Sequence, residues 1–232
     1  MKRLFFIPLL LFSLTSMAAC SPDDDPVEKT PITEEPETPS VPENSDKPDT
    51  PTENRKMLVV YFSAEGHTKA VAERIVELTG ADIHRIEVTD PYTANPYDDS
   101  ERIQREAYND LRPGVANLLD KEVIEKYNTI FVGSPIWWHQ PAMAVCTFLE
   151  AYDLKDKTII PFLTYGATSY LNESMQKIYK ITPDSKHIPE TLPEDLDADD
   201  ITTPGRPDDA GIDMPGNARG TEAWLRRIGF IE

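Results

Sequence analysis

The stretch that decides the fold is MLVVYFSAEGHT, residues 57–68. It starts as a continuous apolar run, which is typical of a strand buried on both faces of a parallel sheet. The run stops at Ser63, and a short loop leads through Gly66 and His67 to Thr68, where a helical pattern begins. Two interpretations of this loop are open. Either its backbone N–H groups and hydroxyls hold a phosphate at the helix N-terminus, or Ser63 or Thr68 simply caps the helix.

Similar apolar runs recur further along the chain, and helical patterns separate them. Strands are predicted at residues 57–62, 81–88, 129–132 and 158–163, with a last strand near Ile188. Helices are predicted at residues 68–79, 100–109, 143–149 and 171–179, and around Trp224. Strands that alternate with helices in this way predict an α/β fold whose parallel sheet is joined by right-handed crossovers.

Three of the predicted strands end in loops that suit a flat, phosphorylated ligand. In an open α/β sheet, ligands bind beyond the carboxyl ends of the strands. Besides the loop of residues 63–68, these loops span residues 133–141 and 164–170, and the second contains Trp137 and Trp138. A tryptophan ring offers a large flat face for stacking. Because neighbouring side chains of extended backbone point in opposite directions, either one ring faces the ligand and the other the core, or both pack into the core.

These segments resemble the flavodoxin family, in the group with a GxPIWWxxxP motif after the third strand. The similarity runs from about residue 57 to 180. It is carried by VGSPIWWHQPA (132–142), FLEAYDLKDKTIIPFLTYG (148–166) and YDDSERIQREAYNDLRPGV (97–115). The resemblance implies a three-layer sandwich with a five-stranded parallel sheet in the order 2-1-3-4-5. It also implies FMN at the switch point between strands 1 and 3, both being known features of flavodoxins.

The resemblance also assigns FMN-binding residues, position by position, on all three loops. They are Ser63, Glu65, Gly66, His67 and Thr68 around the phosphate, Pro135, Ile136, Trp137 and Trp138 beside the isoalloxazine ring, and Thr164, Tyr165, Gly166 and Ala167 on the third loop. Two places depart from the family pattern. Glu65 stands where a hydroxyl or small polar residue is common, and the third loop reads Gly-Ala-Thr-Ser where Gly-Gly-Ser is common. No residue is assigned a catalytic role.

The N-terminal part of the chain has the features of an export signal and a tether. A basic start precedes the apolar run Leu4–Leu14, and small residues then lead to Cys20, as in a secretory signal. The approach to Cys20 resembles a bacterial lipobox, which implies removal of residues 1–19 and a lipid on the cysteine. The following residues are rich in proline and acid and poor in apolar side chains, so we expect disorder. We therefore expect a lipidated, disordered tether at 20–56 and a flavodoxin-like domain at 57–232.

The composition limits the partners and the metal chemistry. The formal net charge of −18 disfavours nucleic acid and anionic lipid surfaces as partners. The chain has two cysteines; with a lipid on Cys20, Cys146 has no disulfide partner and is expected to be a small core residue. The four histidines show no metal-ligand spacing, so no structural metal is predicted.

Two functions are compatible with these patterns. The first is an FMN-dependent electron carrier or oxidoreductase, lipid-anchored in the cell envelope at the outer membrane, facing either the periplasm or the cell surface. Its partner would be a redox protein or a quinone-like small molecule, and the lipid would be its only membrane contact. The paired tryptophans favour this function. The second is a non-enzymatic binding module with the flavodoxin fold and a drifted cofactor site, which Glu65 favours. The proline-rich segment 182–220 contains no clear element and is interpreted as functional or mobile.

Overall fold

The helices and strands alternate along the chain, as the sequence predicts. The computed structural model describes residues 56–93, 95–166, 170–192 and 220–232. Its strands are β1 (Met57–Tyr61), β2 (Asp82–Arg85), β3 (Thr129–Trp137), β4 (Gln140–Pro141), β5 (Thr158–Thr164) and β6 (Lys186–His187). Its helices are α1 (His67–Thr79), α2 (Ser100–Tyr108), α3 (Lys121–Ile124), α4 (Met143–Glu150), α5 (Leu171–Ile181) and α6 (Thr221–Arg227), and the 3₁₀ helix η1 (Pro96–Asp99) precedes α2.

Several predicted features lie outside the described residues. They are the signal of residues 1–19, the lipidation site Cys20, the tether up to residue 55, Ala167 to Ser169, and residues 193–219 of the predicted long loop. Among the described residues, no helix has the length and the apolar character needed to cross a membrane.

A parallel sheet forms the middle layer. Its strand order is β2-β1-β3-β5-β6, and β4 pairs with β3 as a short sixth strand. The pairing of β3 with β4 is antiparallel, and the other pairings are parallel. Since the chain passes from β2 across β1 to β3, the switch point of the sheet lies between β1 and β3. The predicted order 2-1-3-4-5 is therefore confirmed, and β4 is an addition to it.

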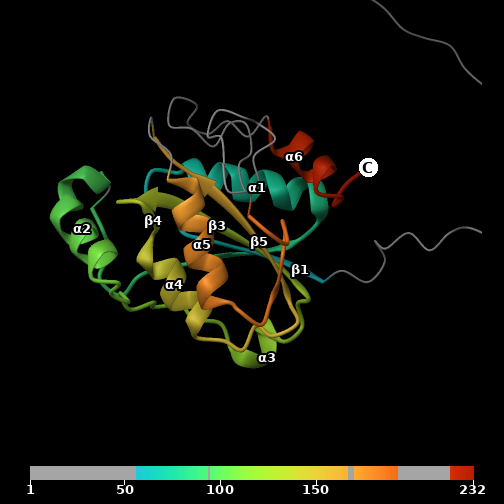
Figure 1. The fold of residues 1–232 in the computed structure, drawn as a ribbon, viewed down its shortest axis with the longest axis horizontal. Helices are drawn as coiled ribbons and strands as arrows, with labels where there is room; N and C mark the ends of the chain where they lie inside the picture. Colours follow the sequence, from blue (N-terminus) through green and yellow to red (C-terminus); the bar gives the residue numbers. More distant parts are fainter. Residues whose placement is uncertain (1–55, 94, 167–169, 193–219) are drawn as a thin grey trace, which may run out of the picture. The chain divides into compact units, whose positions relative to one another are not determined.

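The central strands supply two hydrophobic cores, one on each face of the sheet. On one face, side chains such as Val60, Val132 and Leu163 pack against Phe148 of α4 and Ile178 of α5. On the other face, side chains such as Val59, Phe131 and Phe162 pack against Ile75 of α1 and Trp224 of α6. Figure 1 shows α4 and α5 on one side of the sheet and α1 and α6 on the other. This arrangement confirms the three-layer sandwich.

Strand β3 is longer than predicted. It continues past Val132 to Trp137, turns at Trp138 and His139, and returns as β4. The prediction of a loop at residues 133–141 is therefore wrong, because most of this segment forms a hairpin. Both turn residues have positive φ, 49° and 68°, as in a type I′ turn. Asparagine and glycine usually fill such turns, so the Trp-His pair did not indicate one.

The chain between β2 and β3 builds a wall beyond the carboxyl ends of the strands. Strand β2 ends at Arg85 rather than at Val88 as predicted, because Val88 leaves the sheet and forms an isolated antiparallel bridge with Val115. Between these two residues the chain forms η1 and α2. In Figure 1, α2 stands apart from the other helices at this end of the sheet.

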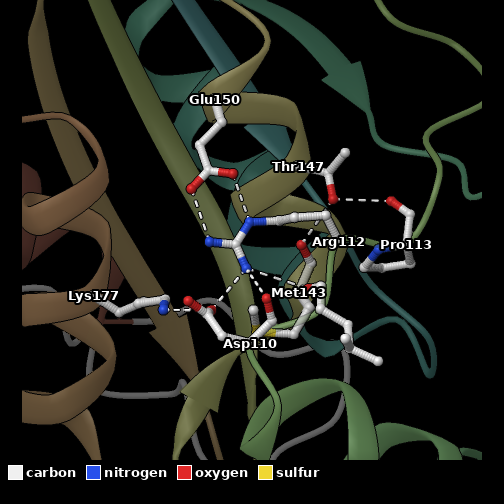
Figure 2. A network of polar contacts seen from close by, with 8 residues as sticks. Asp110, Arg112, Pro113, Met143, Thr147, Glu150 and Lys177 are labelled. Atoms are coloured by element: carbon white, nitrogen blue, oxygen red, sulfur yellow. Dashed lines mark hydrogen bonds and ion pairs between the residues drawn. The ribbon is translucent and has the colours of Figure 1, made fainter.

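An ion-pair network connects the segment that follows α2 to the helices of the sandwich (Figure 2). Arg112 donates two hydrogen bonds to the Glu150 carboxylate of α4, at 2.5 and 2.8 Å. It also donates to Asp110 Oδ1 at 2.7 Å, and Lys177 of α5 donates to the same oxygen. The network therefore connects the chain just after α2 with both α4 and α5.

Asp110→Asn should reduce the loss of stability in acid. The hydrogen bonds from Arg112 and Lys177 lower the pKa of the Asp110 carboxyl to about 2. A carboxyl with a pKa of about 4 when unfolded stabilises the fold above that pH, and this stabilisation is lost as the pH falls from about 4 towards 2. Because the Asp110 side chain is 53 % exposed, screening by solvent leaves about 0.5–1 kcal/mol.

Urea unfolding of both proteins at about pH 6 and at about pH 2.5 measures this difference. The wild type should lose about 0.5–1 kcal/mol more than the variant between the two pH values. An equal loss in the two proteins would show that Asp110 does not contribute to the pH dependence. Asparagine suits the positive φ of 51° at this position, so the variant tests the charge and not the backbone.

Cys146 is the core residue that the sequence predicts. It lies on α4 with no exposed surface and is a free cysteine. Burial raises the pKa of its thiol to about 12. Since the thiolate is the reactive form, this burial disfavours reaction of the cysteine at neutral pH.

Candidate functional site

A cleft of about 270 Å³ opens at the carboxyl ends of β1, β3 and β5. Each of the three loops identified in the sequence contributes to its lining. The contributing residues are Glu65 and His67, then Pro135, Ile136, Trp137 and Trp138, and then Thr164, Tyr165 and Gly166. Segments about a hundred residues apart in sequence therefore meet in one cleft, because the parallel strands end at the same edge of the sheet.

The loop between β1 and α1 leaves the N-terminus of α1 without a side-chain cap. Gly66 is the N-cap residue, with φ of 100°, and no side chain makes a capping hydrogen bond there. Instead, Ser63 Oγ accepts a hydrogen bond from the Gly66 N–H at 3.1 Å. The hydroxyls of Thr68 and Thr164 are hydrogen-bonded to each other at 2.8 Å. The interpretation of Ser63 or Thr68 as a helix cap is therefore wrong, and the uncapped helix end suits an anion.

The conformation of this loop depends on Ser63, Gly66 and Thr68. None of the three lines the cleft. Ser63 and Thr68 are buried, with exposed fractions of 4 % and 1 %. Their hydrogen bonds fix the turn and connect it to the end of β5. Glu65, in contrast, is exposed at the cleft, so its carboxylate is in contact with solvent.

His67 carries a buried polar atom without a partner. Its Nδ1 has no hydrogen bond among the described residues, although it is shielded from solvent. Leaving a buried polar atom unpaired costs about 1–3 kcal/mol, and such atoms are rare in folded proteins. His67 lines the cleft, but its Nδ1 is shielded there, so a ligand would supply the missing hydrogen bond only after the ring rotates towards the cleft.

The two tryptophans form different parts of the cleft wall. Trp137 is half-buried, and its ring packs edge-on against Phe62 and Tyr92, with centroid distances of 5.3 and 5.2 Å. Trp138 is 39 % exposed and lies edge-on to Tyr108, at 6.0 Å. Both line the cleft, so they do not divide into one core ring and one ligand-facing ring. The reason is backbone geometry, since alternation requires extended backbone and Trp138 lies in the turn.

Tyr92, which supports Trp137, is itself held by α2. Its hydroxyl donates a hydrogen bond to the Glu106 carboxylate at 2.5 Å. Arg102 pairs with the same carboxylate at 2.8 Å and lies over the Tyr92 ring, 4.1 Å from its centroid. Burial, assisted by the bond to Glu106, raises the pKa of the Tyr92 hydroxyl, so it remains a hydrogen-bond donor. The position of the Trp137 ring thus depends on polar contacts made by α2.

The outer wall of the cleft could not be identified from the sequence. It consists of Pro96 and Tyr97 of η1 and Ser100 and Ile103 of α2. The only sequence signal for them is that they lie in or next to the stretch 97–115, which resembles the family without indicating which residues face the cleft. Among the described residues, no group of three or more potential metal ligands occurs.

Comparison with known proteins agrees with this geometry. The flavodoxin family model matches residues 56–202. The chain belongs to the flavodoxin family. No curated protein matches this flavodoxin-family chain.

Solved structures with the same fold include candidate flavoproteins from two Bacteroides species. The one from Bacteroides eggerthii DSM 20697 is 29 % identical, with a TM-score of 0.54, over 75 % of this chain and 98 % of that one. The one from Bacteroides uniformis ATCC 8492 is 30 % identical, with a TM-score of 0.52, over 58 % of this chain and 87 % of that one. A flavoprotein from Lactobacillus acidophilus NCFM, in complex with FMN, is 22 % identical, with a TM-score of 0.48, over 58 % and 90 %.

In this flavodoxin-family protein the cleft stands at the switch point, where open α/β sheets bind ligands. It combines an aromatic wall at Trp137 with the uncapped end of α1 and the unpaired His67 Nδ1. The wall suits a flat ring, and the helix end with its imidazole suits a phosphate. The residues present therefore fit a flat cofactor that carries a phosphate.

Proposed function

We propose that this protein is an FMN-binding electron carrier or oxidoreductase, anchored in the cell envelope by a lipid on Cys20. Membership of the flavodoxin family supports FMN as the cofactor. The observation that carries the proposal is the cleft itself, in which Trp137 and His67 share one lining beside the uncapped N-terminus of α1.

Each part of the cleft has a role in holding FMN. The N–H groups at the start of α1 would hold the phosphate, and His67 would add a hydrogen bond at the same end after its ring rotates towards the cleft. Trp137 and Ile136 would line the flat ring on one side, with Tyr97 and Ile103 in the outer wall of the cleft. Bound FMN supplies the electron-transfer chemistry, and the protein binds, orients and shields it. No side chain is assigned to proton transfer. The electron partner in this proposal is a redox protein or a quinone-like molecule.

The purified protein offers a direct test of this function. It should carry flavin, or take up added FMN, with a visible absorption spectrum that differs from that of free FMN. Chemical reduction should bleach this spectrum, and a soluble quinone should restore it. If the protein neither contains nor takes up FMN, the hypothesis of a non-enzymatic binding module with a drifted site is supported instead.

The anchor is tested separately on the exported protein. Mass spectrometry of the membrane fraction should find a mature chain that starts at Cys20 with lipid attached. The variant Cys20→Ser should be absent from that fraction. An unmodified mature N-terminus would overturn the lipid anchor and leave the FMN proposal unaffected, since Cys20 is remote in sequence from the cleft residues.

Glu65→Thr should change FMN affinity by less than about threefold, which corresponds to about 0.6 kcal/mol. A carboxylate turned into the phosphate loop would repel the phosphate by about 3 kcal/mol at a separation of ~6 Å and an effective dielectric of 20. Because Glu65 is exposed, solvent screens this repulsion. Titration of both proteins with FMN, followed by flavin fluorescence, measures the ratio. A gain of about a hundredfold in the variant would show that Glu65 opposes the cofactor.

A further inference from the structure

A second cavity lies beside the first, on the β2 side of the loop after β1. It has a volume of about 430 Å³. Its lining includes Phe62, Ser63, Ala64, Arg85, Pro91 and Tyr92. None of these residues lines the first cleft, and the cavity lies at the carboxyl ends of β1 and β2, the edge of the sheet where ligands bind in this fold class.

Arg85 supplies the positive charge in the lining of this cavity. Its guanidinium donates one hydrogen bond, to the Ser63 carbonyl at 3.2 Å. None of the ion pairs found among the described residues includes it. By contrast, Arg74, Arg102 and Arg112 each pair with two carboxylates. Arg85 is exposed at this cavity, so an external anion can reach its guanidinium, which has no ion-pair partner among the described residues of a chain with a net charge of −18.

The remaining lining restricts the kind of anion. Phe62, Pro91 and Tyr92 make one part of the cavity apolar, and the Tyr92 hydroxyl is already occupied by Glu106. Glu87 also lines the cavity without pairing with Arg85, and its charge disfavours a dianion such as a phosphate ester. A guanidinium matches a carboxylate well, because its planar N–H groups form two parallel hydrogen bonds.

We propose that this cavity is a second ligand site, which takes a small aromatic monocarboxylate with its carboxylate on Arg85 and its ring against Phe62 and Tyr92. The site does not depend on the cofactor, because its lining is separate from that of the first cleft. It is nevertheless connected to the cofactor loop, since Arg85 holds the Ser63 carbonyl and Ser63 Oγ holds the Gly66 N–H.

The test uses benzoate as the probe and benzamide as its neutral counterpart, with FMN-free protein and calorimetric titration. Benzoate should bind at least about tenfold more tightly than benzamide, since a charge-assisted pair contributes more than a neutral one. Arg85→Gln should remove this difference. Arg105→Gln, which neutralises an exposed arginine on α2 that also has no ion pair among the described residues, should leave it unchanged. Equal binding of the two probes, or an unchanged preference in Arg85→Gln, would overturn the proposal.

The location of the probe is checked by NMR. Benzoate should shift the amide signals of Ser63, Ala64 and Arg85 and leave that of Trp138 unchanged. Perturbations centred on Trp138 would place the probe in the first cleft and overturn the second site. A protein that binds benzoate in this way but takes up no FMN would support the second site and refute the proposed function, so the two outcomes are distinguishable.

Discussion

Trp137→Ala is expected to lower FMN affinity about a hundredfold. A ring that covers on the order of 100 Å² of a flat ligand contributes about 2.5 kcal/mol at 25 cal/mol per Å². Ring–ring geometry adds about 0.5 kcal/mol, and the sum corresponds to a factor of roughly a hundred in the dissociation constant. The edge contacts with Phe62 and Tyr92 hold this ring in place. The ring therefore loses little conformational entropy when FMN binds. Fluorescence titration with FMN measures the loss.

Two matched variants show whether the effect belongs to the ring at this position. Trp137→Phe keeps an aromatic face and should lose less than about tenfold, or 1.4 kcal/mol. Trp138→Ala removes a neighbouring ring that is 39 % exposed and should also lose less than about tenfold. Circular dichroism and thermal melting confirm that the variants are folded. If Trp138→Ala has the larger effect in folded protein, Trp138 is the main stacking residue and the assigned roles are wrong.

Gly133→Ala is expected to destabilise the fold by about 3 kcal/mol or more. Gly133 lies in β3 between Tyr61 of β1 and Phe162 of β5. A Cβ atom there would stand 2.3 Å from Phe162 Cζ and 2.8 Å from Tyr61 Cβ. Overpacking in a core usually costs about 1–3 kcal/mol, and the upper end applies because neighbours crowd the site from both sides. Since whole domains are stable by only about 5–15 kcal/mol, urea unfolding should show this loss clearly.

Gly166→Ala is the control for this substitution. A Cβ atom at Gly166 would meet no atom within 4 Å among the described residues. Its free energy of unfolding should therefore stay within about 0.5 kcal/mol of the wild type. A stable Gly133→Ala protein, or equal losses in the two variants, would show that β3 tolerates a side chain between its neighbours.

The parts of the fold that could be predicted are those that are buried on both faces. Strands β1 and β5 and the first half of β3 are continuous apolar runs for this reason. Strand β2 lies at the edge of the sheet, and its Ile83 is 44 % exposed, so the alternating pattern did not mark its end. The hairpin at Trp138 was missed because neither turn residue is glycine or asparagine.

The candidate site also has a part that could be predicted from the sequence and a part that could not. The three loops could be placed together because they follow parallel strands, and topology brings such loops to one edge. The wall formed by η1 and α2 could not be predicted from the sequence, because its position depends on tertiary contacts. The bonds of Glu106 to Tyr92 and of Arg112 to Glu150 connect segments that no local pattern relates. The unpaired His67 Nδ1 likewise depends on burial, which a single residue in a sequence does not reveal.

The central claim is that the start of α1 holds the phosphate of FMN, and comparing FMN with riboflavin tests it most directly. Riboflavin has the same ring and lacks the phosphate. Two or more charge-assisted hydrogen bonds to the phosphate, each worth about 1.5–3 kcal/mol, predict that the wild-type protein binds FMN at least about a hundredfold more tightly than riboflavin. Equal affinities for the two flavins, or no binding of either, would contradict the account.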